Sequence, residues 1–287
     1  MRLATFRQDG APAEIGVVID GDRIAPLNRL APGLAADMID LIARWPSLES
    51  EARRLTVSPP QTLALADVRL LAPVPRPGKV MAIGLNYADH IEETGLEAPA
   101  HQIWFSKQVN AVNGPFDPVE IPRVSRFVDY EAEMVAIIGA GGRHISREAA
   151  PGAVIGFCVG DDVSERHWQN RTSQWVLGKS FDTHAPFGPW ITTSDEVGDP
   201  HLLGIRGLVN GDVRQDSNTR HLVFNVWDQL AELSRVMTLN PGDVIYTGTP
   251  GGVGAAMKPP RPLKAGDLVR IEIDRLGAIE NRFEAEA

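Results

Sequence analysis

Short apolar runs separated by clusters of turn residues dominate the first part of the chain. Residues 2–6, 14–19 and 23–27 read RLATF, EIGVVI and RIAPL, which are lengths typical of β-strands. The turn Asp20-Gly21-Asp22 between the last two runs predicts a hairpin. Residues 38–45, MIDLIARW, place their apolar side chains at helical spacing and predict a short helix.

A group of prolines then interrupts this pattern. Pro73, Pro75 and Pro77 break regular structure, because proline lacks an amide hydrogen and fixes its own backbone. We therefore predict a small N-terminal domain over residues 1–75 and a second domain over residues 76–287.

The second part of the chain again alternates apolar runs with turns. Strands are expected at residues 80–84, 130–138, 153–159, 244–247 and 268–273. One amphipathic helix is expected between Asn225 and Met237, because its large apolar residues recur at helical spacing. Strands outnumber helices in this pattern, so the predicted fold class is α+β with β-structure dominating.

Composition narrows the class of protein. The chain has 287 residues, 43% of them hydrophobic, and a formal net charge of −9, so it lacks the basic surface that nucleic acid or anionic lipid requires. Its one cysteine, Cys158, lies in an apolar run and is expected in the core. No run approaches the roughly 20 apolar residues of a membrane-spanning helix, and the first residues lack the apolar segment of a secretory signal. We expect a cytoplasmic protein with a small-molecule partner, and neither nucleic acid nor membrane as a partner.

The sharpest chemical feature is a group of carboxylates. Glu131 and Glu133 are two apart, so on a strand they share a face, and Asp161-Asp162 ends the next buried run. Glu131, Glu133 and Asp162 together would form an all-oxygen site, which selects Mg²⁺, Mn²⁺ or Ca²⁺ over zinc. Their motifs supply no evident positive partner, which favours a bound cation. The alternatives are a solvated strand face and an ordinary helix cap.

Three further features could carry chemistry. His90 and Glu93 are three apart and would touch on a helix, where a carboxylate orients an imidazole for proton transfer. Lys179 lies in a glycine-containing turn beside aromatic residues and could hold an anionic oxygen. Residues 247–254, TGTPGGVG, could bring backbone N–H groups close to an anion. The alternatives are a mixed-charge surface helix, a surface lysine and a plain glycine turn.

The order of these features is more specific than any one of them. The motifs NY-x-x-H-x-x-E, SRFVDYEAE, DDVSERHWQ, QWVLGKSFDT, NGDVRQDSNT and PGDVIYTGTPGGVG follow one another over roughly residues 78–280. In this order and spacing the chain resembles the fumarylacetoacetate hydrolase family. Residues 1–75 resemble, less specifically, the small N-terminal domain of its bacterial members.

The resemblance implies a fold and a metal. It implies a mixed β-sandwich roll, usually homodimeric, with a small N-terminal α/β domain. It also implies that Glu131, Glu133 and Asp162 bind one Mg²⁺, for which Mn²⁺ or Ca²⁺ can substitute. Asp161 is a departure, since many members have Asn at this position.

The resemblance further implies roles for the other motif residues. His90 and Glu93 match the catalytic dyad, and Lys179 matches a lysine that stabilises the substrate and its enolate. Thr249 matches a residue that holds the carboxylate end of the substrate. The segment from Ile91 to Phe105 matches a lid that becomes ordered when ligand binds. The remaining expected substrate contacts, in the same motifs, are Tyr87, Gly248 and Arg166.

These roles together imply a reaction. We expect a Mg²⁺-dependent hydrolase that cleaves the C3–C4 bond of 2,4-diketo acids (3-acylpyruvates) to pyruvate and a carboxylic acid. The favoured substrate is a 2,4-diketo-3-deoxy sugar acid such as a deoxyrhamnonate or deoxyfuconate derivative. The alternatives are a fumarylpyruvate hydrolase, an oxaloacetate decarboxylase or 2-hydroxy-dienoate isomerase on the same scaffold, and a non-catalytic, metal-dependent binder of small acids.

Overall fold

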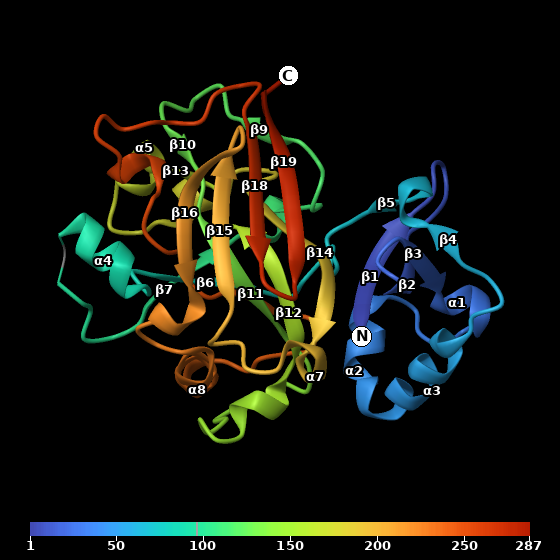
Figure 1. Ribbon diagram of the computed structural model, residues 1–287. Helices are drawn as coiled ribbons and strands as arrows, with labels where there is room; N and C mark the ends of the chain where they lie inside the picture. Colours follow the sequence, from blue (N-terminus) through green and yellow to red (C-terminus); the bar gives the residue numbers. More distant parts are fainter. Residues whose placement is uncertain (96) are drawn as a thin grey trace.

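A large mixed β-sheet runs through the molecule in the computed structural model, which describes residues 1–95 and 97–287 (Figure 1). From one edge to the other, its main path consists of β4 (Leu63–Ala64), β3 (Arg23–Pro26), β2 (Glu14–Ile19), β1 (Arg2–Arg7), β14 (Ala185–Thr193), β12 (Val154–Asp161), β11 (Ala132–Ile138), β17 (Val244–Tyr246), β6 (Val80–Gly84) and β7 (Ile103–Lys107). Two short strands lie off this path, β5 (Arg69–Leu70) beside β1 and β8 (Val112–Asn113) beside β14.

A smaller sheet covers one face of the large one. Its strands, in spatial order, are β16 (Asp212–Asn218), β15 (Gly204–Val209), β18 (Leu268–Ile273), β19 (Gly277–Ala285) and β9 (Val119–Ile121). A separate two-stranded ladder consists of β10 (Val128–Asp129) and β13 (Ser164–Glu165).

Helices are short and lie around the sheets. The α-helices are α1 (Leu27–Leu30), α2 (Met38–Ala43), α3 (Trp45–Val57), α4 (Ala88–Thr94), α5 (Arg166–Gln169), α6 (Val176–Lys179), α7 (Ser194–Val197) and α8 (Val226–Val236). The 3₁₀ turns are η1 (Leu65–Asp67), η2 (Val109–Ala111), η3 (Ala150–Ala153), η4 (Thr219–His221) and η5 (Gly254–Ala256). Within the described ranges, no helix is long and apolar enough to cross a membrane.

Strand β11 explains how the core is divided, because it is buried on both faces. Its even-numbered residues, such as Met134 and Ile138, pack with residues of the small sheet in one hydrophobic cluster. Its odd-numbered residues Val135 and Ile137 pack in a second cluster, which includes residues of α2. Tyr130, just before this strand, packs in the first of these clusters.

The N-terminal strands extend the large sheet rather than forming an isolated one. Strand β1 pairs with β14 through Arg2 with Thr192 and Leu3 with Ile191. Figure 1 shows the N-terminal segment, in blue, beside the rest of the molecule at this edge. The division of the chain at residue 75 stays a prediction.

Several elements differ from the sequence expectations. The predicted helix over 38–45 ends at Ala43, and a second helix, α3, begins at Trp45 with Pro46 in its first turn, where the missing N–H is tolerated. The strand predicted from Tyr130 begins as β11 at Ala132. Helix α8 closely matches its prediction, and the Asn225 side chain caps it by accepting from two backbone N–H groups.

Candidate active site

Three carboxylates meet where adjacent strands of the large sheet begin and end. Glu131 precedes β11, Glu133 lies within it, and Asp162 follows β12. The register pairs Ala132 with Asp161, and the Asp162 N–H donates to the Glu131 carbonyl at 3.0 Å. One oxygen of each carboxylate lies within 4.8 Å of the others, and all three residues are buried. The predicted three-carboxylate cluster is therefore present.

The expectation that these carboxylates lack a positive partner is wrong. Lys179 Nζ lies 2.8 Å from Glu131 Oε2 and 2.6 Å from Asp162 Oδ2. Lys107 Nζ, which is also buried, lies 2.5 Å from Asp162 Oδ1. Arg166 forms ion pairs with two carboxylates. Its Nη1 lies 2.6 Å from Glu131, and its Nη2 lies 2.8 Å from Asp129.

With these ion pairs at Glu131, the pKa values of the two glutamates shift in opposite directions. Burial acts to raise the pKa of Glu131, but the charges of Lys179 and Arg166 outweigh it and hold that pKa well below its usual range. Burial raises the pKa of Glu133 well above its usual value, and the charges of Asp162 and Glu131 add to the rise. Within the described residues Glu133 has no ion pair, and its Oε2 accepts the Gly248 N–H at 2.7 Å.

Charge balance indicates that the cluster can hold a divalent cation. Its five carboxyl groups belong to Asp129, Glu131, Glu133, Asp161 and Asp162, and its three cationic groups belong to Lys107, Arg166 and Lys179. Fully ionised, the cluster has two more negative than positive charges, which is costly to bury without compensation. A hard divalent cation on the three clustered oxygens would supply this compensation, so the residues fit such an ion.

Asp161 contributes to the excess of negative charge in this cluster. Its Oδ1 accepts the Glu131 N–H at 2.8 Å, while its buried Oδ2 has no hydrogen-bond donor among the described residues. Burial raises the pKa of this carboxyl well above its usual value. Through the hydrogen bond from the Glu131 N–H, Asp161 therefore holds the backbone of Glu131 in place.

The predicted dyad forms on α4, which lies at the rim of the site. His90 Nδ1 and Glu93 Oε2 are 3.4 Å apart on consecutive turns of the helix. The Gly252 N–H lies 3.0 Å from each oxygen of Glu93 and fixes the carboxylate from the glycine loop. Asp89, on the same helix, accepts a hydrogen bond from Ser217 of β16. Helix α4 is thus attached to two separate segments of the domain.

One small cavity of about 70 Å³ is lined by Lys179 and by members of the carboxylate cluster and of the dyad, whereas Asp162 and Glu93 do not line it. The polar residues that line it are His90, Glu131, Glu133, Arg166, Gln169, Lys179 and Thr249. Phe105 and Trp175 form part of an apolar wall, and Lys179 Nζ lies 4.9 Å from the centre of the Phe105 ring. The site can therefore hold a small acid between these charged groups and the apolar wall.

Two expected substrate contacts lie elsewhere. Tyr87 precedes α4, is completely buried in the core, and is not among the residues that line the cavity. Gly248 also does not line it, and its N–H is used by Glu133. A direct substrate contact of either residue stays a prediction. Residue 96 of the predicted lid segment lies outside the described residues, and ordering of that segment on ligand binding also stays a prediction.

Sequence reasoning missed several residues that position this site. Gln215 accepts the Ala132 N–H at 2.9 Å and donates to Thr249 Oγ1 at 2.8 Å, so one buried side chain joins β11 to the glycine loop. The Asn86 side chain donates hydrogen bonds to the Phe224 and Thr247 carbonyls and accepts one from the Phe224 N–H. A signal for Lys107 did exist, since a lysine that ends the apolar run IWFSK needs an acidic partner once it is buried. Cys158 is buried as expected, and burial raises the pKa of its thiol.

Comparison with known proteins identifies the family. Residues 79–284 match the family model described as fumarylacetoacetate hydrolase C-terminal. The chain belongs to the fumarylacetoacetate hydrolase family. Its relatives include the mitochondrial oxaloacetate tautomerase fahd2 of Xenopus laevis, 45% identical over 98% of this chain and 89% of that protein. The human mitochondrial oxaloacetate tautomerase FAHD2A is 43% identical over 98% of this chain and 91% of that protein.

Solved structures confirm the predicted α+β class and the family fold. Maleylpyruvate hydrolase of Sphingobium sp. SYK-6, in complex with manganese (II) ion and pyruvate, is 37% identical with a TM-score of 0.84. Fumarylacetoacetate hydrolase of psychrophilic Exiguobacterium antarcticum is 37% identical with a TM-score of 0.87. Both alignments cover 100% of each chain. The chain thus has the fold of metal-dependent hydrolases, isomerases and tautomerases that act on small acids.

Proposed function

We propose that this chain is a divalent-metal-dependent enzyme of small 2-oxo acids that moves a proton at C3 of its substrate. The reaction we propose first is the keto–enol interconversion of oxaloacetate. The observation that carries this proposal is the cavity of about 70 Å³ that His90 and Lys179 line together with two carboxylates of the cluster. Glu93 lies 3.4 Å from His90 on the same helix. This volume suits a compact four-carbon acid better than a long sugar acid, and relatives 43–45% identical are named oxaloacetate tautomerases.

The carboxylates Glu131, Glu133 and Asp162 would hold the divalent cation. When bound, such an ion polarises the 2-oxo group as a Lewis acid. Lys179 is held between Glu131 and Asp162, and although burial acts to lower its pKa, these two carboxylates raise it above the ordinary lysine value. Its ammonium is therefore charged and offers fixed positive charge to the oxygen on which an enolate develops.

His90 would carry the proton. Its Nδ1 faces Glu93, so Nε2 is the atom that exchanges a proton with the substrate. In the keto-to-enol direction the C3–H bond breaks and its proton passes to Nε2 as the C2–C3 double bond forms, and Nε2 then returns a proton to the 2-oxygen, so that His90 ends the step in its starting state. The reverse direction uses the same groups, and no water or co-reactant is consumed.

Hydrolysis of 2,4-diketo acids is the second candidate. The same dyad would activate a water molecule to attack C4, and the C3–C4 bond would break to give a carboxylic acid and the enolate of pyruvate. The similarity to the manganese- and pyruvate-bound maleylpyruvate hydrolase supports this reaction. The 2,4-diketo-3-deoxy sugar acids are the less favoured substrates here because the cavity is small.

A substrate panel separates these reactions. Purified protein with Mg²⁺ is mixed with enol-rich oxaloacetate, and both the ultraviolet enol absorbance and the release of pyruvate are followed. Faster enol loss without pyruvate supports the tautomerase, whereas pyruvate from oxaloacetate would indicate decarboxylation. Pyruvate from fumarylpyruvate or another 3-acylpyruvate, with no effect on oxaloacetate enol, would replace our first proposal by the second.

Matched variants of α4 complete the test. His90→Asn removes the proton carrier, whereas Glu92→Gln changes the charge of an exposed neighbour on the same helix. We expect loss of activity only in the first. Equal activity in wild type and His90→Asn would exclude the proposed role of the dyad, and a chain that binds Mg²⁺ but acts on no substrate would be a non-catalytic binder.

The remaining expectations are also proposals. We propose Mg²⁺ as the ion, with Mn²⁺ or Ca²⁺ as substitutes, on the chemistry of the three carboxylates. We propose a homodimer on family resemblance, and light scattering that gives a monomer at micromolar concentration would contradict it. A cytoplasmic location stays a prediction, since the relatives named above are mitochondrial by their names.

A further inference from the structure

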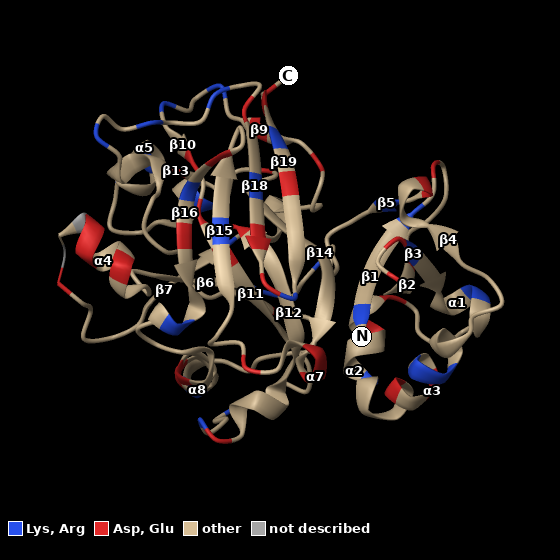
Figure 2. Cartoon of the chain, viewed as in Figure 1, with Lys and Arg blue, Asp and Glu red and all other residues tan. Residues whose placement is uncertain are grey.

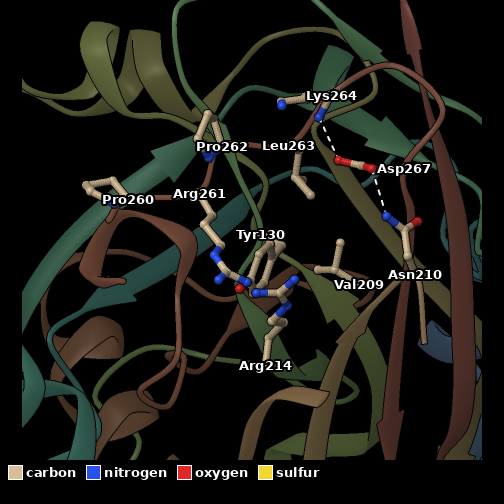
Figure 3. A pocket seen from close by; sticks show the side chains of 10 residues that line it. All are labelled: Tyr130, Val209, Asn210, Arg214, Pro260, Arg261, Pro262, Leu263, Lys264 and Asp267. Atoms are coloured by element: carbon tan, nitrogen blue, oxygen red, sulfur yellow. Dashed lines mark hydrogen bonds between the residues drawn. The ribbon is translucent and has the colours of Figure 1, made fainter. Parts of the chain in front are cut away.

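A second, larger pocket lies next to the segment that carries the carboxylates. Its volume is about 370 Å³, within the range of roughly 300–1,000 Å³ of small-molecule sites. Tyr130 forms its floor, Val209 and Arg214 contribute from β15 and β16, and residues 260–264 form its outer wall (Figure 3). This pocket is distinct from the carboxylate cavity, because the two have no lining residue in common.

Two arginine side chains meet in this pocket, and acidic groups neutralise little of their positive charge. Figure 3 shows the guanidinium groups of Arg214 and Arg261 beside Tyr130. Nε of Arg214 is buried without a hydrogen-bond partner, and its ion pair, to the exposed Asp212, has an N···O distance of 3.4 Å. Arg261 has no ion pair to any of the residues 1–95 and 97–287.

This arrangement is unusual in a chain of net charge −9. Two guanidinium groups repel each other unless an anion lies between them, and their planar donors suit carboxylate and phosphate oxygens. Figure 2 shows further basic residues along the loop between η5 and β18. The local positive field would therefore attract an anion to this face.

The far end of the pocket has the opposite character. Asp267 accepts hydrogen bonds from Asn210 Nδ2 and the Lys264 N–H, each at 2.8 Å, which fixes its carboxylate in place (Figure 3). A carboxylate has more acceptor sites than these two donors occupy. A ligand with an anionic group at one end and a hydroxyl group at the other would satisfy both ends.

We propose that this pocket, between Tyr130 and the loop of residues 260–264, binds a small oxyanion through Arg214 and Arg261, with ligand hydroxyl groups facing Asp267. The pocket adjoins the dyad through one chain of contacts. Tyr130 donates to the Gly252 carbonyl at 2.9 Å, and the Gly252 N–H holds Glu93. A ligand here would lie one hydrogen-bonded residue from the carboxylate that orients His90.

The test is calorimetric titration with three probes: inorganic phosphate, malonate and glycerol 3-phosphate. Buffer without divalent cations and with about 0.15 M salt suppresses binding at the carboxylate cluster and weak surface pairing. Phosphate against malonate distinguishes a phosphate from a dicarboxylate ligand. The difference in affinity between glycerol 3-phosphate and phosphate shows whether ligand hydroxyl groups contact Asp267. We expect saturable binding of at least one probe, strongest for glycerol 3-phosphate.

Variants assign the binding to this pocket. Arg214→Gln/Arg261→Gln should weaken affinity at least tenfold, and Arg261→Gln alone, at an exposed side chain, should weaken it without affecting the fold. Arg54→Gln is the matched control, because Arg54 is an exposed arginine on α3 with the same charge. Binding retained by the double variant, an equal loss in Arg54→Gln, or no binding of any probe would each overturn the proposal.

Discussion

Replacing each glutamate of the cluster by glutamine should have opposite effects on the metal-free protein. Glu131→Gln removes the carboxylate that pairs with Lys179 and Arg166, whereas Glu133→Gln removes one that has no ion pair in the described chain. Both substitutions preserve side-chain volume. The comparison therefore isolates charge, and it tests whether the three carboxylates form a site for a divalent cation.

The magnitudes follow from the geometry. Breaking a buried ion pair by removing one partner costs about 3–5 kcal/mol, and Lys179 and Arg166 each keep a second carboxylate, so we expect Glu131→Gln to lose about 3 kcal/mol. Ionised carboxylates within 4.8 Å of each other repel by at least about 3.5 kcal/mol at an effective dielectric constant of about 20. The raised pKa of Glu133 expresses the same cost as protonation in the folded state. Lys179 offsets part of this repulsion, so we expect Glu133→Gln to gain about 1–2 kcal/mol.

The assay is urea denaturation of wild type and both variants, in EDTA and in excess Mg²⁺. Wild type should gain stability with Mg²⁺, because an ion that binds only the folded state stabilises it by mass action. Both variants should lose most of this gain. Glu165→Gln is the control, since Glu165 is a buried carboxylate that accepts backbone N–H groups outside the cluster and should leave the Mg²⁺ effect intact.

Two results would refute this reasoning. If Glu133→Gln destabilised the EDTA-treated protein as much as Glu131→Gln, repulsion at Glu133 would not be significant. If both variants kept the wild-type response to Mg²⁺, the three carboxylates would not be the metal site.

Three further predictions concern residues around the site. Burial lowers the pKa of His184 to about 3, against about 6.5 in the unfolded chain, so only the unfolded state gains this proton as pH falls below 6.5. Wild type should therefore lose about 2 kcal/mol more than His184→Gln between pH 6.5 and 5 in urea denaturation, and parallel pH curves would contradict this. Gly252 has φ +102°, and a Cβ there would overlap the Arg214 carbonyl oxygen, so Gly252→Ala should displace the loop that holds Glu93 and lower kcat/KM. Gly211→Ala is its control, with positive φ but open space around the added Cβ, and an equal loss in both would exclude the loop mechanism. Gln215→Leu should raise KM more than it weakens Mg²⁺ binding, because Gln215 positions Thr249, and calorimetry that gives equal losses would assign Gln215 a purely structural role.

The sequence predicted best those elements whose signals are local. Strands β6 and β18 lie at their predicted bounds, because uninterrupted apolar or alternating runs between turns leave little ambiguity. The His90–Glu93 contact follows from helical spacing alone. By contrast β14 is a long buried strand that contains Pro186, Gly188 and Pro189, which are residues that normally argue against a strand.

Charge partners could not be predicted in this way, since they come from distant segments. Lys107 is 55 residues from Asp162 in the sequence, and only the pairing of strands brings the two side chains together. Gln215, 83 residues from Ala132, likewise had no local signal. The carboxylate cluster itself could be predicted from the sequence, because Glu131 and Glu133 lie on one short segment and Asp162 directly follows the neighbouring strand.

Hydrogen–deuterium exchange at C3 of pyruvate most directly tests the central claim, that His90 moves a proton on a 2-oxo acid held at a divalent cation. Pyruvate is incubated with the protein in D₂O, and the methyl signal is followed by NMR. Wild type with Mg²⁺ should exchange these protons, EDTA should abolish the exchange, and His90→Asn should slow it by roughly 10²–10⁴-fold while Mg²⁺ affinity is unchanged. Exchange at the wild-type rate in His90→Asn, or exchange unaffected by EDTA, would contradict the account.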